Sequence, residues 1–323
     1  MEIIPQILLL IVGFVLLIKG ADFFVDGASS TALNFKVPKI LIGLTIIAFG
    51  TSAPELAVSI QALAEGNTDM VLGNVIGSNI INILLILGVA AVIRPLRIKN
   101  NTIRKEIPIT VLVSTLLVVL FLDIRINAAS VNRIARSDGL AILLFFAIFL
   151  YYLINTAISE HKKSKNQEAK ESPRWKLLPS ILIVILGLTG IIFGSDLVVN
   201  SASEIATHIG MSERLISLTV IALGTSLPEL VTTIVSAKKG ETDLLLGNIL
   251  GSNIFNICMV LGIPVAIFGT VTPASFQVID LIVLIFSTIL LFIFSATKHK
   301  ITRAEGVAML ATFAVYYSVI FII

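Results

Sequence analysis

The sequence has few charged residues, few histidines and a single cysteine. Asp, Glu, Lys and Arg make up 13% of its 323 residues, whereas an ordinary soluble domain carries about 25%. So few charges cannot cover a soluble surface of this size, which excludes soluble globular, disordered and nucleic-acid-binding proteins. The single cysteine, Cys258, excludes internal disulfides and cysteine-rich metal sites. The three histidines lie in or near polar segments, which argues against a histidine-bound zinc or haem, so we expect no cofactor.

Long apolar runs take the place of the missing charges. Hydrophobic residues make up 56% of the chain, and the mean hydropathy is +1.02. A helix needs roughly 20 mainly apolar residues to cross the hydrocarbon layer, whereas strands of a membrane barrel alternate in polarity. We therefore expect an all-α polytopic membrane protein in the lipid bilayer, with ten transmembrane helices at 3–27, 39–63, 70–93, 106–123, 138–158, 178–199, 213–237, 243–267, 277–297 and 304–323.

The distribution of Lys and Arg between the loops predicts the orientation in the membrane. The loops after the odd-numbered spans hold 18 of the 23 basic residues, and the loops on the opposite side hold 4. Loops rich in Lys and Arg remain on the cytoplasmic side. We therefore expect a multi-pass protein of the cell membrane (plasma or inner membrane) with both termini extracytoplasmic.

The sequence contains an internal duplication at a shift of 174 residues. Residues 45–82 (TIIAFGTSAPELAVSIQALAEGNTDMVLGNVIGSNIIN) align without a gap with residues 219–256 (TVIALGTSLPELVTTIVSAKKGETDLLLGNILGSNIFN), and 21 of 38 positions are identical. The identities are mostly Gly, Ser, Thr, Pro, Glu and Asn, which a shared apolar composition would not produce. Each repeat holds five spans, an odd number, so the second copy must cross the membrane in the opposite sense.

This duplication predicts the domain organisation. We expect a first inverted repeat at 1–159, a cytoplasmic linker at 160–177 and a second inverted repeat at 178–323. The linker is typical of a solvated connection, although such basic segments can also contact lipid headgroups. Inverted repeats recur in secondary transporters, whose substrate site lies near the midplane between the halves. An ion channel has no comparable need for two inverted halves.

Each repeat carries a signal for a broken helix. A proline inside a helix lacks an N–H and clashes with the carbonyl four residues earlier, which frees that carbonyl from its helical partner. The pairs are Gly50 with Pro54 in the second span and Gly224 with Pro228 in the seventh. Broken helices occur in membranes where the backbone is buried or lines a cavity. A simple proline kink is the alternative, and the carboxylate that follows each proline argues against it.

Glu55 and Glu229 follow these prolines. Of the 20 acidic residues, these two lie deep within an apolar span. An acidic side chain at a helix centre costs about 2.5–3.5 kcal/mol on insertion scales, so its presence at both equivalent positions suggests a use. The sequence places no Lys or Arg at that depth. The counter-charge must therefore be a proton or a bound cation.

The third and eighth spans add neutral oxygen ligands. Ser78 and Asn82 are four residues apart and share a helix face, as do Ser252 and Asn256. Hydrogen bonding between helices is the alternative role for these side chains. Together with the two carboxylates they form a set of hard oxygen ligands, which suits Ca²⁺ and Na⁺ and does not suit soft metals.

The repeated motifs resemble those of a known protein family. GTSAPEL with GNVIGSNIIN, and GTSLPEL with GNILGSNIFN, resemble the two alpha-repeats of the cation/Ca²⁺ exchanger superfamily, closest to its prokaryotic sodium/calcium exchanger branch. The resemblance covers both repeats and, through the ten-span layout, nearly the whole chain. It implies two inverted five-helix halves, with cation sites between the broken helices two and seven and helices three and eight. It also implies that helices one and six slide across the rest.

The resemblance assigns roles to individual residues. Glu55 and Glu229 would be the Ca²⁺ carboxylates, helped by the carbonyls of Thr51 and Thr225. The same glutamates would bind sodium together with Ala48, Ser52, Ser78, Asn82, Ala222, Ser226, Ser252 and Asn256. Potassium-dependent family members carry Asp at the position that matches Asn256, so this asparagine argues against potassium coupling.

We therefore expect a secondary active antiporter, not an enzyme, that exchanges sodium for calcium at one shared site. Two glutamates supply two negative charges, which one Ca²⁺ neutralises and several Na⁺ replace; the resemblance implies three Na⁺ per Ca²⁺. The closest alternative is a proton/calcium antiporter on the same fold, with H⁺ as the coupled ion. An ion channel and a membrane-embedded enzyme are further alternatives, but the sequence shows no nucleophile–base pair or cofactor motif.

Overall fold

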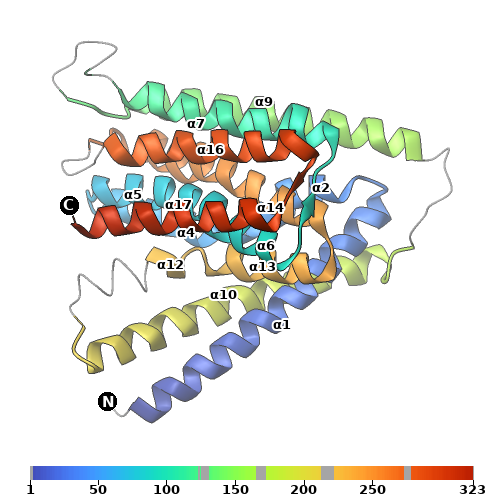
Figure 1. Cartoon of the computed structure of the whole chain (residues 1–323), viewed down its shortest axis with the longest axis horizontal. Helices are drawn as coiled ribbons and strands as arrows, with labels where there is room; N and C mark the ends of the chain where they lie inside the picture. Colours follow the sequence, from blue (N-terminus) through green and yellow to red (C-terminus); the bar gives the residue numbers. More distant parts are fainter. Residues whose placement is uncertain are drawn as a thin grey trace.

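We obtained a computed structural model of the chain, which describes residues 3–122, 124, 131–164, 172–211, 222–272 and 278–322. The described residues are almost entirely helical (Figure 1). Among them, six helices are long and apolar enough to cross a membrane, or seven if a helix pair that bends by 45° counts as one span. The helical membrane protein expected from the apolar runs is thereby confirmed.

The helices of the first half follow the apolar runs of the sequence. In chain order they are α1 (Ile3–Phe35), α2 (Lys39–Ile42), the π-helical turn η1 (Gly43–Ile47), α3 (Ala48–Thr51), α4 (Ala53–Ala64), α5 (Thr68–Ile80), the π-helical turn η2 (Ile81–Ile86), α6 (Leu87–Ile93), the π-helical turn η3 (Thr102–Glu106), α7 (Ile107–Phe121) and α9 (Arg136–Ser164). The pair that bends by 45° is Lys39–Thr51 with Ala53–Ala64.

The described residues of the second half are also mostly helical. Its helices are α10 (Leu177–His208), α12 (Ala222–Gly224), α13 (Leu227–Lys239), α14 (Thr242–Phe255), the π-helical turn η5 (Asn256–Leu261), α15 (Gly262–Phe268), α16 (Val278–Lys298) and α17 (Arg303–Ile322). The predicted span at 213–237 begins outside the described residues. A two-stranded antiparallel sheet joins the halves, with β1 (Leu96–Arg97) paired to β2 (Lys300–Ile301) so that Leu96 lies opposite Ile301.

Three helices are longer than the predicted spans. α1 continues to Phe35 instead of residue 27, α10 to His208 instead of residue 199, and α9 to Ser164, inside the predicted linker. The apolar run marks the part of a helix in hydrocarbon, whereas a helix continues as long as its polar residues find partners. On α1, for example, Ser29 Oγ donates to Glu241 at 3.1 Å and Asn34 Nδ2 donates to the Trp175 carbonyl at 2.8 Å, both beyond the predicted span.

Helices α1 and α10 form a closely packed pair that crosses the other helices obliquely (Figure 1). A Cβ added to Gly187 would lie 2.5 Å from the Phe24 backbone nitrogen, and one added to Gly194 would lie 2.6 Å from the Leu17 nitrogen. Glycine therefore lets the two backbones touch. The most apolar windows of α1 and α10 are 17% and 28% buried, against 83% for Thr242–Phe268, so the pair lies at the periphery.

The broken second helix packs just as closely on the central helix α14. A Cβ added to Gly43 in η1 would lie 2.7 Å from the Leu244 carbonyl oxygen, and one added to Gly247 would lie 2.5 Å from the Ile40 oxygen. Backbone contact between η1 and α14 thus holds the first repeat's broken helix against the second repeat's buried helix. This packing places the polar residues of both repeats in one interior region.

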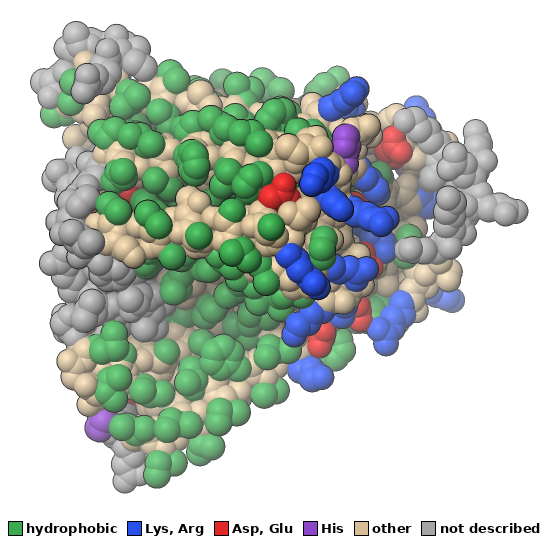
Figure 2. Space-filling model, in the orientation of Figure 1, with side chains coloured by type: hydrophobic (Ala, Val, Ile, Leu, Met, Phe, Trp, Pro, Cys, Tyr) green, Lys and Arg blue, Asp and Glu red, His purple; other side chains and the backbone are tan. Residues whose placement is uncertain are grey.

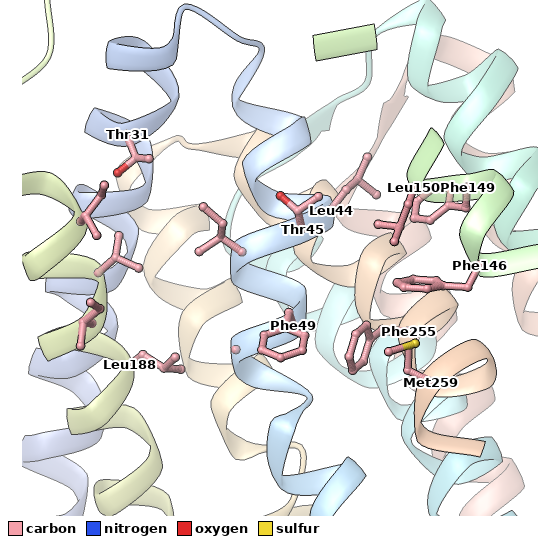
Figure 3. Close-up of a pocket in the computed structure, with 15 residues that line it drawn as sticks. Thr31, Leu44, Thr45, Phe49, Phe146, Phe149, Leu150, Leu188, Phe255 and Met259 are labelled. Atoms are coloured by element: carbon pink, nitrogen blue, oxygen red, sulfur yellow. The ribbon is translucent and has the colours of Figure 1, made fainter. Parts of the chain in front are cut away.

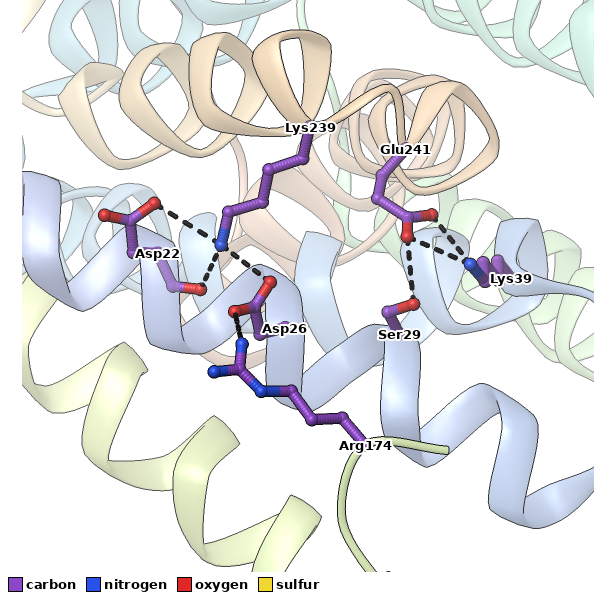
Figure 4. A network of polar contacts seen from close by, with 7 residues as sticks. All are labelled: Asp22, Asp26, Ser29, Lys39, Arg174, Lys239 and Glu241. Atoms are coloured by element: carbon purple, nitrogen blue, oxygen red, sulfur yellow. Dashed lines mark hydrogen bonds and ion pairs between the residues drawn. The ribbon is translucent and has the colours of Figure 1, made fainter. Parts of the chain in front are cut away.

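Apolar side chains cover the flank of the molecule, while Lys and Arg gather at one end (Figure 2). We call this the basic end and define it by Lys39, Lys99, Arg174 and Lys239. A network of ion pairs there joins α1 to the turn between α13 and α14 (Figure 4). Lys239 Nζ lies 2.6 Å from Asp26 Oδ1 and 3.4 Å from Asp22 Oδ1. Lys39 Nζ lies 2.9 Å from Glu241 Oε1. α1 begins and α17 ends at the opposite end of the molecule (Figure 1).

Candidate cation site

The second helix and its counterpart in the second repeat break at a serine with the same backbone conformation. Ser52 has φ −88° and ψ 6°, and Ser226 has φ −89° and ψ 5°. In both copies a proline follows in the first turn of the next helix, where its missing N–H is tolerated. The breaks lie within the intervals Gly50–Pro54 and Gly224–Pro228.

A hydroxyl group from α10 contacts the break in the second repeat. Ser195 Oγ donates a hydrogen bond of 3.2 Å to the carbonyl oxygen of Gly224. This carbonyl lies four residues before Pro228, which cannot donate to it. The break therefore leaves a backbone oxygen open to partners outside its own helix, as a backbone ligand for a cation requires.

Glu229 lies where three helical segments meet. Its Oε1 accepts hydrogen bonds from Ser52 Oγ at 3.0 Å and from Ser252 Oγ at 3.4 Å. The glutamate belongs to α13, Ser52 to the break before α4, and Ser252 to α14. The side chain is fully buried. A serine of the first repeat thus holds the acid of the second repeat.

The same region holds buried polar atoms without hydrogen-bond partners in the described part of the chain. They include both carboxyl oxygens of Glu55, Oε2 of Glu229, the amide groups of Asn82 and Asn256, and Oγ of Ser226. Buried polar groups are normally paired, and an unpaired one costs about 1–3 kcal/mol or more. The ion pairs between described residues include neither glutamate. These orphaned oxygens fit a cation as the missing partner.

Two asparagines support the site from neighbouring helices. Asn74 Nδ2 donates to the Glu55 carbonyl oxygen at 3.0 Å and to Ser59 Oγ at 2.9 Å. Its counterpart in the second repeat, Asn248, accepts a hydrogen bond of 3.1 Å from Thr51 Oγ1 through Oδ1. Our sequence reasoning did not assign these residues. The signal was there, because both copies keep an asparagine at this position of the repeated motif.

The other predicted site residues lie beside the two breaks, on the helices α5 and α14, or in the turns that follow those helices. Thr51, Ser78, Ser252 and Ala48 are buried, and Thr225 at the second break is half-buried. Ala222 begins α12, and its side chain lies outside what the structure describes. Asn82 and Asn256 both fall in π-helical turns, η2 and η5. Such turns are frequent at functional sites because they redirect a side chain within a helix.

The oxygen groups around the two glutamates suit a hard cation. Among the described residues, no cluster of three or more His, Cys, Asp or Glu side chains could hold a metal. The centre instead combines two carboxylates with hydroxyl, amide and backbone oxygens. Two negative charges match one divalent cation or two monovalent cations, and neutral oxygens complete the coordination of ions such as Ca²⁺.

Comparisons with known proteins identify the family of the chain. The family model described as "Sodium/calcium exchanger protein" matches residues 5–155 and 179–322. The putative antiporter CaxA of Alkalimonas amylolytica is 40% identical over 317 residues, which cover 96% of this chain and 97% of the relative. The sodium/calcium exchanger MaX1 of Methanosarcina acetivorans is 31% identical over 98% of both chains.

A solved structure extends the likeness to the fold. The sodium-calcium exchanger NCX_Mj superimposes with a TM-score of 0.84 and 30% identity, covering 98% of this chain and 99% of that one. A more distant relative, the Ca(2+)/H(+) antiporter ChaA of Bacillus subtilis, is 24% identical over 96% of this chain and 91% of its own length. The chain belongs to the sodium/calcium exchanger family of multi-pass membrane transporters.

Proposed function

We propose that this protein is a secondary active antiporter that exchanges sodium for calcium by alternating access, with Glu55 and Glu229 as the shared cation site. The observation that carries the proposal is the pair of buried carboxylates whose oxygens Glu55 Oε1, Glu55 Oε2 and Glu229 Oε2 have no partner among the described residues. A carboxylate at this depth needs a positive charge, and the surrounding hydroxyl and amide oxygens suit Na⁺ and Ca²⁺.

In this proposal, calcium and sodium compete for overlapping ligands. Ca²⁺ binds both carboxylates and the carbonyls of Thr51 and Thr225. Sodium ions use the same carboxylates together with Ala48, Ser52, Ser78, Asn82, Ala222, Ser226, Ser252 and Asn256. One Ca²⁺ neutralises the two glutamates, and Na⁺ must displace it to occupy them. An empty site keeps its charges unscreened in a region of low dielectric, which opposes the switch between the two membrane faces and enforces exchange.

The architecture in this proposal consists of ten transmembrane helices in two inverted repeats, 1–159 and 178–323, joined by a cytoplasmic linker at 160–177. The matched breaks at Ser52 and Ser226 support the duplication, as do the left-handed turn glycines Gly66 and Gly240, which are also 174 residues apart. We place the basic end in the cytoplasm. Both termini are then extracytoplasmic, in keeping with the start of α1 and the end of α17 at the opposite end (Figure 1).

The test is sodium-driven calcium uptake. Vesicles loaded with sodium and containing the purified protein are diluted into sodium-free buffer with ⁴⁵Ca²⁺. Glu55→Gln and Glu229→Gln each remove a site charge while keeping the side-chain shape, and we expect both to abolish uptake. Glu65→Gln is the matched control, because Glu65 is an exposed acid that ends α4 and accepts a hydrogen bond from Gln61. Near-normal uptake by either site variant would overturn the assignment.

A proton/calcium antiporter is the second candidate, and the similarity to the Ca(2+)/H(+) antiporter ChaA favours keeping it. Both candidates use the same two carboxylates, so the site variants do not separate them. The two candidates are separated by imposing a sodium gradient, a proton gradient or a potassium gradient on the same wild-type vesicles. We expect calcium uptake with the sodium gradient alone. Uptake that follows the proton gradient alone would identify H⁺, and not Na⁺, as the coupled ion.

A further inference from the structure

An apolar groove opens on the flank of the molecule, behind the broken second helix (Figure 3). α1 and α10 form one wall. α9, Phe255 at the end of α14 and Met259 in η5 form the other, and η1 and α3 form the floor. On the floor, Ile46 and Phe49 are 37% and 54% exposed. The cavity measures 570 Å³, within the range of about 300–1,000 Å³ typical of pockets that bind small ligands.

The lining of this groove offers nothing to a polar ligand. It contains no charged side chain, and its hydroxyl groups belong to Thr31 and Thr45. Thr31 Oγ1 donates to the Gly27 carbonyl at 2.8 Å, and Thr45 Oγ1 donates to the Leu41 carbonyl at 2.6 Å. Thr31 Oγ1 also lies 3.2 Å from Ser180 Oγ on α10, so both hydroxyls already have partners in the protein. A water molecule needs two to four polar partners to occupy a cavity stably, and this groove does not supply them.

The groove is continuous with the surface that faces the lipid. Ile185 and Leu150, on opposite walls, are 54% and 37% exposed, and their neighbours Leu186 and Ile154 are more exposed still. Along α10 the lining extends from Ile181 to Leu188, a length of about 10 Å at 1.5 Å per residue. Hydrocarbon from the bilayer can therefore enter sideways, and an apolar cavity of this size gains from filling because its lining otherwise lacks contacts.

We propose that this groove is a binding site for one acyl chain of a bilayer phospholipid. The chain lies against Phe49 and Gly50, which directly precede the buried Thr51 and Ser52 in sequence. It touches the α1–α10 pair on one wall, α9 and η5 on the other, and the broken second helix on the floor. Bound lipid therefore stabilises the spacing between the α1–α10 pair and these helices. This proposal rests on the apolar groove and the membrane fold, not on which ions are exchanged.

The test measures bound lipid by native mass spectrometry. The full chain is reconstituted in vesicles of phosphatidylglycerol with one dibrominated acyl chain, extracted in detergent and weighed intact. The bromine mass separates lipid taken from the vesicles from lipid carried over from the cells. We expect the wild-type chain to retain one brominated lipid.

Two variants fill the groove and one does not. Ile185→Trp places an indole in the groove from the α10 wall, and Ile46→Trp places one there from the floor. Leu186→Trp is the matched control, because Leu186 is the next residue on α10, is 68% exposed and does not line the groove. We expect the fraction of chains with bound brominated lipid to fall at least tenfold in both groove variants and to stay at the wild-type value in the control.

Thermal unfolding of each variant in the same detergent verifies that it is folded. Wild-type chain that retains no brominated lipid would overturn the proposal, as would groove variants that are folded and retain as much lipid as the control. Calcium uptake is not part of this readout, so the outcome stands whether or not sodium drives exchange.

Discussion

Ser52 donates a hydrogen bond of 3.0 Å to Glu229, although 177 residues separate the two in the chain. The reciprocal bond, from Ser226 to Glu55, is absent from the described residues, where Ser226 Oγ and both Glu55 oxygens have no partner. The duplicated motif therefore forms an asymmetric site, in which one carboxylate is held by the other repeat and one is open. Neither repeat alone contains the arrangement, so the site needs both.

Ser52→Ala removes the donor that orients Glu229. A hydrogen bond to a charged group contributes about 1.5–3 kcal/mol, so we expect the calcium concentration for half-maximal uptake to rise roughly tenfold or more. Titration of ⁴⁵Ca²⁺ uptake into sodium-loaded vesicles measures it. Ser287→Ala is the control, because Ser287 is equally buried and bonds to Leu284 in its own helix. Equal affinities in the two variants would show that the bond to Glu229 has no part in binding.

Gly187→Ala tests the close packing of α1 on α10. The added methyl group would lie 2.5 Å from the Phe24 backbone nitrogen, and a backbone atom cannot move aside as a side chain can. Overpacking of this kind costs about 1–3 kcal/mol, so we expect a lower unfolding temperature in detergent. Thr189→Ala is the control, since Thr189 lies on the same helix, is exposed and donates its hydrogen bond to Ile185 within that helix. Unchanged thermal stability of Gly187→Ala would contradict backbone contact between the two helices.

Lys239→Met tests the ion-pair network at the basic end (Figure 4). Lys239 holds Asp22 and Asp26 of α1 against the end of α13. Its partly exposed pairs contribute up to about 1 kcal/mol each, so we expect amide hydrogens in the last third of α1 to exchange several-fold faster. Hydrogen–deuterium exchange with peptide-level mass spectrometry measures this rate. The neighbouring exposed residue provides the control Lys238→Met, and equal rates in both variants would exclude a restraining role for Lys239.

The duplication explains how much of this centre could be predicted from the sequence. The break between Gly50 and Pro54 follows from local chemistry, because proline removes a donor wherever it occurs. The same applies to Glu55, whose burial follows from its position inside an apolar run. Both inferences use residues that are close in the chain, and the second copy repeats them.

The contacts between the repeats could not be predicted in this way. The hydrogen bond from Ser52 to Glu229 depends on how η1 packs on α14, which residue spacing does not encode. The π-helical turns at Asn82 and Asn256 depend on the register of backbone hydrogen bonds, which leaves no trace in the apolar pattern. The extension of α1 to Phe35 was also missed, because the partners of its polar residues Ser29 and Asn34 lie on other segments.

The central claim is that one pair of carboxylates binds calcium and sodium in competition. Equilibrium binding of ⁴⁵Ca²⁺ to the purified chain at increasing sodium concentration tests it most directly, with Glu229→Gln measured beside wild type. We predict one calcium ion per chain, complete displacement by sodium, and loss of binding in the variant. Calcium that stays bound at saturating sodium, or that binds equally to Glu229→Gln, would contradict the claim.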